Sequence, residues 1–141
     1  MSKVAVVYWS GTGNTEAMAN EVAEGAKEAG AEVMVFGAAE FSEDKMDEFD
    51  AIAFGCPAMG AEVLEEEEFQ PMFDACEGKL GGKKIALFGS YGWGDGEWMR
   101  NWEEECMNAG AQIACDSVIA NGAPDEEAVE SCRGLGRTLV Q

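Results

Sequence analysis

Five short apolar runs, separated by longer segments with helical periodicity, constrain the fold of this chain more than any other feature. Most of the runs are apolar throughout, instead of alternating between apolar and polar residues, which is typical of parallel strands covered on both faces. We therefore expect a parallel sheet. Its strands are predicted at Val4–Tyr8, Glu32–Phe36, Ala51–Gly55, Lys84–Gly89 and Gln112–Ala120.

The segments between these runs carry apolar residues at the spacing of a helix with one buried face. Gly30 and Gly110 follow two of the stripes and are typical helix stops, and Pro124 suits the first turn of the last helix. Helices are expected at residues 15–29, 69–80 and 98–109, after Pro124 and, as a short element, at 40–48.

Alternation of strands and helices over the whole length predicts an α/β fold with a doubly wound parallel sheet. The length of 141 residues predicts one domain, residues 1–141. Ligands in such sheets bind beyond the carboxyl ends of the strands. The functional loops are therefore expected at residues 9–15, 56–62, 90–96 and 121–123.

The amino-acid composition argues against several classes of function and partner for this chain. Nine Lys and Arg against 28 Asp and Glu give a formal net charge of −19, which disfavours nucleic acid and anionic membranes and favours basic protein partners. The chain has no His and no C-x-x-C pair among its five Cys, so His-dependent triads and common metal sites are not expected. The thiols are expected to be buried and reduced, and the absence of a long apolar run predicts a cytoplasmic protein.

The first functional loop is SGTGNT, which lies between a predicted strand and the start of a predicted helix. Free N–H groups and the positive end of the helix dipole favour an anion there. Ser10, Thr12, Asn14 and Thr15 add neutral donors, while glycines let the backbone curl closely. The loop lacks the Lys of a nucleotide P-loop and the third glycine of a dinucleotide fingerprint. It predicts a phosphate cradle, with a plain helix cap as the alternative.

The second and third loops predict a site for a planar group. Met59–Glu62 suits a tight turn in which Gly60 takes a positive φ and Glu62 accepts from a ring N–H. The acidic run Glu65–Glu68 is interpreted as solvated residues at a helix start. Trp93, between two glycines, is either a stacking platform or a surface packing residue. A phosphate at one end and a flat hydrogen-bonding ring at the other fit riboflavin phosphate (FMN).

YWSGTGNTEAMA, GCPAMGAEVLEEEEFQP and LFGSYGWGDGEWMR together resemble the short-chain flavodoxins of anaerobic bacteria. The resemblance covers essentially the whole chain. It implies a five-stranded parallel sheet in the order 2-1-3-4-5, with FMN bound at its carboxyl edge. It also implies a low-potential one-electron carrier that shuttles electrons between redox enzymes, not an enzyme itself, with neither catalytic residues nor a metal.

Carried over to this chain, the resemblance assigns the phosphate to Ser10–Thr15 and the reactive edge of the flavin to Met59–Glu62. It assigns ring stacking to Trp93, and Ala61 departs from relatives that often carry a polar residue there. The expected cofactor-binding residues are Ser10, Gly11, Thr12, Gly13, Asn14, Thr15, Pro57, Ala58, Met59, Gly60, Ala61, Glu62, Ser90, Tyr91, Gly92, Trp93 and Asn121.

The expected partners are the basic surfaces of reductases and iron–sulfur oxidoreductases, in transient complexes with a monomer. Two alternatives remain open from the sequence. One is an FMN-dependent NAD(P)H:quinone reductase, which requires a substrate pocket that this short chain has no insertion to build. The other is a phosphate-responsive receiver, which requires acidic residues where Tyr8, Trp9 and Ser10 stand.

Overall fold

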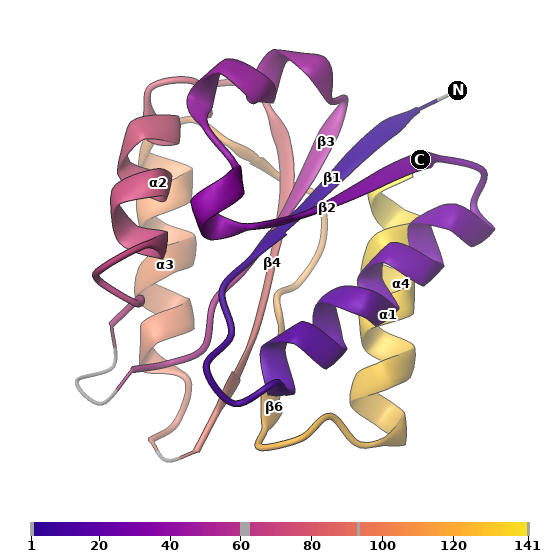
Figure 1. Ribbon diagram of the computed structural model, residues 1–141, viewed down its shortest axis with the longest axis vertical. Helices are drawn as coiled ribbons and strands as arrows, with labels where there is room; N and C mark the ends of the chain where they lie inside the picture. Colours follow the sequence, from indigo (N-terminus) through magenta and orange to yellow (C-terminus); the bar gives the residue numbers. More distant parts are fainter. Residues whose placement is uncertain (1, 60–62, 93, 141) are drawn as a thin grey trace.

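The computed structural model describes residues 2–59, 63–92 and 94–140, and its strands form one parallel sheet (Figure 1). The strand order is β2-β1-β3-β4-β5, with β6 also paired to β4, so the predicted doubly wound sheet and its order are confirmed. The strands are β1 Lys3–Tyr8, β2 Glu32–Gly37, β3 Ala51–Gly55, β4 Lys84–Tyr91, β5 Gln112–Ile113 and β6 Val118–Asn121.

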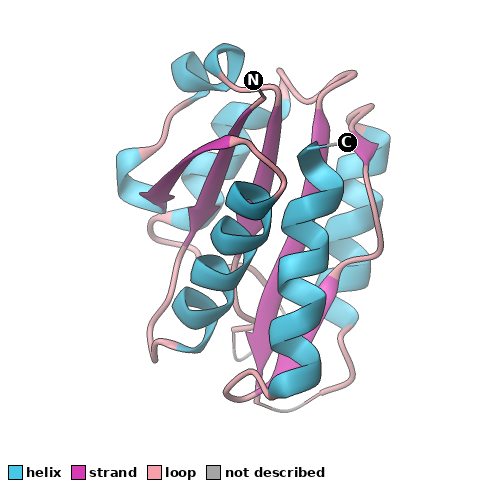
Figure 2. Cartoon of the chain, turned by 90° about the vertical axis from the view of Figure 1, so that its right-hand side faces the viewer, coloured by secondary structure: helices cyan, strands magenta, loops and turns pink. Residues whose placement is uncertain are grey.

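Helices cover both faces of the sheet. Helices α1 (Asn14–Glu28) and α4 (Glu126–Val140) lie side by side on one face, as Figure 2 shows. Helices α2 (Phe69–Glu77) and α3 (Glu97–Asn108) cover the other face. Two apolar cores result, one on each side of the buried central strands. No helix of the described ranges is long and apolar enough to cross a membrane.

The predicted fifth strand is wrong as one continuous element. Ile85 pairs with Ile113, but Phe88 pairs with Val118, so four residues of the outer strand face only two of β4. The two extra residues of the outer strand interrupt its hydrogen bonding to β4 between β5 and β6, as a β-bulge does. Cys115–Ser117 lie in this break, outside both β5 and β6.

The short helix expected at residues 40–48 needs a smaller correction, and the helix stops predicted at Gly30 and Gly110 agree with the structure. The segment expected as one short helix forms two 3₁₀ helices, η1 (Ala38–Glu40) and η2 (Glu43–Glu48). Pro124 precedes α4, and Asp125 caps that helix by accepting the Ala128 N–H at 2.8 Å. Gly30 and Gly110 have φ of 95° and 87° at the ends of α1 and α3, as predicted for helix stops.

Helices α1 and α4 approach closely enough for their backbones to touch. A Cβ built on Gly136 would lie 2.1 Å from the Val22 carbonyl oxygen, and one on Gly25 would lie 2.0 Å from the Arg133 oxygen. Arg133 Nε also contacts Glu21 Oε1 at 2.8 Å. This contact fixes α1, and therefore the loop that precedes it, against the rest of the fold.

Candidate functional site

Three predicted loops meet at the carboxyl edge of the sheet, the lower edge in Figure 1. They enclose a hollow of about 270 Å³ with mostly apolar walls. The first loop follows β1, the second follows β3 and the third follows β4. The lining residues are Trp9, Gly11, Thr12, Asn14, Pro57, Ala58, Met59, Ser90, Tyr91, Gly92 and Gly122.

The first loop leaves backbone donors without acceptors at the start of α1, next to this hollow. The Ala17 N–H bonds to the Gly13 carbonyl at 3.0 Å, so the N–H groups of Asn14 and Thr15 precede the helical ladder. Within the described ranges neither N–H has an acceptor. Ser10 Oγ accepts the N–H of Gly13 at 3.0 Å and that of Glu16 at 3.3 Å. The serine therefore shapes the turn while its own hydroxyl proton stays available.

Gly13 supplies the sharp bend at the start of α1. Its φ of 95° is a left-handed conformation that L side chains rarely adopt, and no atom lies within 4 Å of a Cβ built there. A Cβ on Gly11 would lie 3.0 Å from the Trp9 ring. The dihedral of Gly13 therefore favours glycine, whereas a side chain at Gly11 would fit only if the Trp9 indole moved by a few tenths of an ångström.

Thr15 lies beneath the hollow, between the first loop and the third. Its side chain is buried, and Thr15 Oγ1 lies 3.2 Å from Ser90 Oγ and accepts the Ser90 N–H at 3.3 Å. The hydroxyl thus joins the first loop to the end of β4 beneath the hollow. Thr15 therefore positions the first and third loops relative to each other.

The second loop is anchored by a buried carboxylate. Glu65 Oε1 accepts the N–H groups of Glu68 and Phe69 at 2.7 and 2.8 Å, and Glu65 Oε2 accepts that of Glu67 at 2.8 Å. Burial alone would raise the pKa of this carboxyl, but the three backbone bonds hold the pKa below its usual value. The expectation of a solvated acidic run is therefore wrong for Glu65, which is 5% exposed, and right for the exposed Glu66–Glu68.

Trp9 joins the first loop to the second. Its Nε1 donates to Glu68 Oε1 at 3.0 Å, while its ring lines the hollow and packs over Gly11. Trp9 and Gly122 are not among the expected cofactor-binding residues, although they lie in the loops 9–15 and 121–123 that were expected to be functional. Each directly follows a strand at its carboxyl end, which is the signal that selected those loops.

Cys56 lies behind the second loop and carries no chemistry of its own. Burial raises the pKa of its thiol to about 12, so it stays protonated, and its carbonyl accepts the Trp98 Nε1 proton at 3.1 Å. Cys76, Cys106 and Cys132 are also buried, as expected, whereas Cys115 is only half-buried; all five are free thiols.

The remaining expected residues divide into two groups. Asn121 lies beside Tyr91 at the end of β6, and the next N–H, of Gly122, donates to the Tyr91 carbonyl at 2.8 Å. Asn121 itself is not among the residues that line the hollow. Gly60, Ala61, Glu62 and Trp93, expected at the flavin ring, lie outside the described residues.

The residues present fit a ligand with a phosphate and a flat ring. The unpaired N–H groups at the start of α1 suit an anion, and SGTGNT has no charged side chain to repel it. The adjoining walls from Trp9, Pro57, Met59 and Tyr91 are apolar or aromatic, which suits a planar ring.

Comparison with known proteins gives the class. The family described as Flavodoxin matches residues 6–136. A flavodoxin from Megasphaera elsdenii is 47% identical over 98% of each chain, and one from Clostridium beijerinckii is 45% identical over 96% of this chain and 97% of that one. The solution structure of two-electron reduced Megasphaera elsdenii flavodoxin superposes with a TM-score of 0.90, at 45% identity over 97% of this chain and 98% of that one.

The chain belongs to the flavodoxin family. It is an FMN-binding electron carrier that serves redox partners. It is not an enzyme, and the quinone reductase alternative is not favoured.

Proposed function

We propose that this chain forms a single FMN-binding domain that holds the cofactor in the hollow between its three loops. The phosphate lies at Ser10–Thr15 and the ring lies against the second and third loops. The observation that carries this proposal is the convergence of all three loops on one hollow, beside unpaired N–H groups at the start of α1. Bound FMN supplies the reversible one-electron chemistry, and the protein supplies position and electrostatics.

In this proposal the protein holds the phosphate by oriented dipoles. The N–H groups of Asn14 and Thr15 point out of the helix start, and the hydroxyls of Ser10 and Thr12 add donors. The Thr15–Ser90 contact of 3.2 Å keeps this cradle at a fixed distance from the third loop. Trp9, held by Glu68, closes one wall and excludes water from the ring.

The charge of the protein makes the fully reduced carrier a strong electron donor. A net charge of −19 and binding loops without Lys or Arg disfavour further negative charge in the hollow. We expect Glu66→Gln and Glu67→Gln, beside the second loop, to raise the second one-electron potential. Glu48→Gln, exposed at the other end of the sheet, is the matched control. Equal effects at all three positions would contradict this electrostatic control.

The same charge governs the partners. We propose a cytoplasmic monomer that docks transiently on basic surfaces of reductases and iron–sulfur oxidoreductases. Electron transfer to such partners is expected to slow as ionic strength rises, because salt screens the attraction. A rate independent of ionic strength would contradict electrostatic docking.

The experiment that tests the proposal is a visible spectrum of the purified protein during stepwise reduction. The expected result is a bound flavin spectrum that changes in two separate one-electron steps. A protein that neither contains nor takes up FMN would refute the proposal, and NAD(P)H oxidation by the protein alone would favour the reductase alternative.

A further inference from the structure

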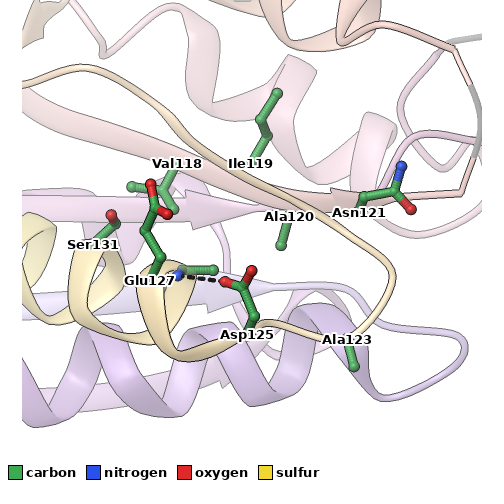
Figure 3. A pocket seen from close by; sticks show the side chains of 9 residues that line it. Val118, Ile119, Ala120, Asn121, Ala123, Asp125, Glu127 and Ser131 are labelled. Atoms are coloured by element: carbon green, nitrogen blue, oxygen red, sulfur yellow. Dashed lines mark hydrogen bonds between the residues drawn. The ribbon is translucent and has the colours of Figure 1, made fainter.

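A second concave surface runs along the open edge of β6 and is distinct from the flavin hollow. Figure 3 shows its lower part, a hollow of about 260 Å³ between β6 and the first turns of α4. A second hollow of about 500 Å³ continues it past Cys115 and Thr138. Val118, Ile119 and Ser131 line both. We call this continuous surface the edge groove.

The backbone in the edge groove has unpaired groups. Residues of a parallel strand point their N–H and C=O alternately to the two sides. The Gly122 N–H bonds to the Tyr91 carbonyl of β4, so Ala120 and Val118 face β4. Ile119 and Asn121 therefore direct their N–H and C=O outward. Since β6 pairs only with β4 among the described strands, this edge can accept a further strand.

The walls of the edge groove are acidic. Asp116, Asp125 and Glu127 line it, and no Lys or Arg is among the described lining residues. Figure 3 shows Glu127 extending from α4 toward Val118. The nearby Arg133 and Arg137 are already paired with acidic groups, Arg133 with Glu21 and Arg137 with Glu28 and Glu130. An occupant with positive charge is thus favoured by complementarity.

The edge groove ends beside the electron-transfer site. Asn121 lines the groove, and the next residue, Gly122, lines the flavin hollow. A segment bound along β6 is thereby held next to the cofactor without covering it. A second copy of this chain is a poor occupant, because each copy carries a net charge of −19.

We propose that the edge groove binds an extended basic segment of a redox partner, which adds to β6 as a further strand. This inference rests on the proposed function, since it assigns a docking surface to the electron carrier. Ladder hydrogen bonds to Ile119 and Asn121 supply a sequence-tolerant part of the affinity. Asp116, Asp125 and Glu127 select lysine- and arginine-bearing segments and speed their association.

The test is titration of the ¹⁵N-labelled FMN-loaded protein with a synthetic heptapeptide of alternating lysine and valine, followed by amide NMR. The expected shifts are centred on Ile119, Asn121 and Ser131 and shrink at high salt. Ile119→Pro removes one outward N–H without breaking the ladder to β4. We expect it to raise Kd about tenfold, the equivalent of roughly 1.4 kcal/mol, while Ile119→Val, which keeps the N–H, leaves Kd unchanged.

Two further variants keep the proposal falsifiable if Ile119→Pro does not fold. Glu127→Lys on the exposed side of α4 should weaken peptide binding. Val35→Pro, at the open edge of β2 on the other side of the sheet, should leave it unchanged. Shifts confined to β2 or to the flavin loops, or equal binding by Glu127→Lys, would overturn the proposal. Self-association of the free protein through the Ile119, Asn121 and Ser131 amides would also overturn the proposal.

Visible absorbance of each sample separates this proposal from the proposed function. Normal FMN content without binding at the edge groove refutes the docking surface alone. Binding at the groove by a protein that never takes up FMN refutes the electron carrier and leaves a basic-peptide site.

Discussion

Gly136→Ala tests the crossing of α1 and α4, which holds the proposed phosphate-binding loop in place. The added Cβ would lie 2.1 Å from the Val22 carbonyl oxygen and 2.8 Å from the Ala26 nitrogen. Both atoms are backbone, so neither can rotate away, and the helices must separate by about 1 Å to relieve the overlap. Overpacking of this kind costs about 1–3 kcal/mol, and the better helix propensity of alanine offsets about 1 kcal/mol of it at most.

Gly134→Ala is the matched control, because it lies two residues away in the same helix. Its Cβ would have only the Arg137 guanidinium at 4.0 Å, so the propensity gain of about 0.5–1 kcal/mol should appear as stabilisation. We expect the free energy of unfolding, from urea denaturation, to fall by roughly 1–2 kcal/mol in Gly136→Ala. Equal stability of the two variants, or stabilisation by Gly136→Ala, would refute the reasoning.

Three further substitutions test the buried Thr15 and Glu65 and the half-buried Glu105. Thr15→Val leaves the Ser90 N–H without its acceptor, so urea denaturation should show a loss of about 1–3 kcal/mol; no loss would contradict the role given to Thr15. Glu65→Gln weakens three backbone bonds to a carboxylate of lowered pKa, and a loss of about 1–3 kcal/mol is expected at neutral pH. A lowered pKa contributes stability that disappears as the pH falls through that pKa, so the free energies of unfolding of wild type and Glu65→Gln should converge in acid. A difference that persists in acid would contradict the stabilising role of the Glu65 carboxylate. Burial and the charge of Glu77 raise the pKa of Glu105 to about 7, so wild type should lose stability as the pH rises through 7, and thermal unfolding of Glu105→Gln should show less of that loss. Identical pH profiles would contradict the raised pKa.

The fold was predictable because its signals are local. Runs such as Val4–Tyr8 and Ala51–Gly55 are continuously apolar, which happens when helices cover both faces of a strand. The break between β5 and β6 was not predictable in this way. The break depends on how many residues of the outer strand lie opposite Ala86 and Leu87 of β4. That number is set by the pairing of two strands, so the apolar pattern of one segment cannot predict it.

The site was predictable at the level of loops and less so at the level of side chains. The position of SGTGNT between a strand and a helix predicts an anion cradle, and the described residues leave the Asn14 and Thr15 N–H groups without acceptors there. The burial of Thr15 depends on its contact with Ser90, which is distant in the sequence. The burial of Glu65 depends on the path of a turn that the sequence alone does not define. Acidic runs are usually solvated, and the inward turn of the Glu65 carboxylate becomes visible only in the folded protein.

The measurement that most directly tests the central claim compares FMN with riboflavin in calorimetric titrations of the flavin-free protein. If the start of α1 holds the phosphate, FMN should bind more tightly by about 100-fold or more, since two charge-assisted hydrogen bonds together contribute roughly 3 kcal/mol or more. Equal affinities for the two flavins would mean that SGTGNT does not hold the phosphate, and the proposed site would be wrong.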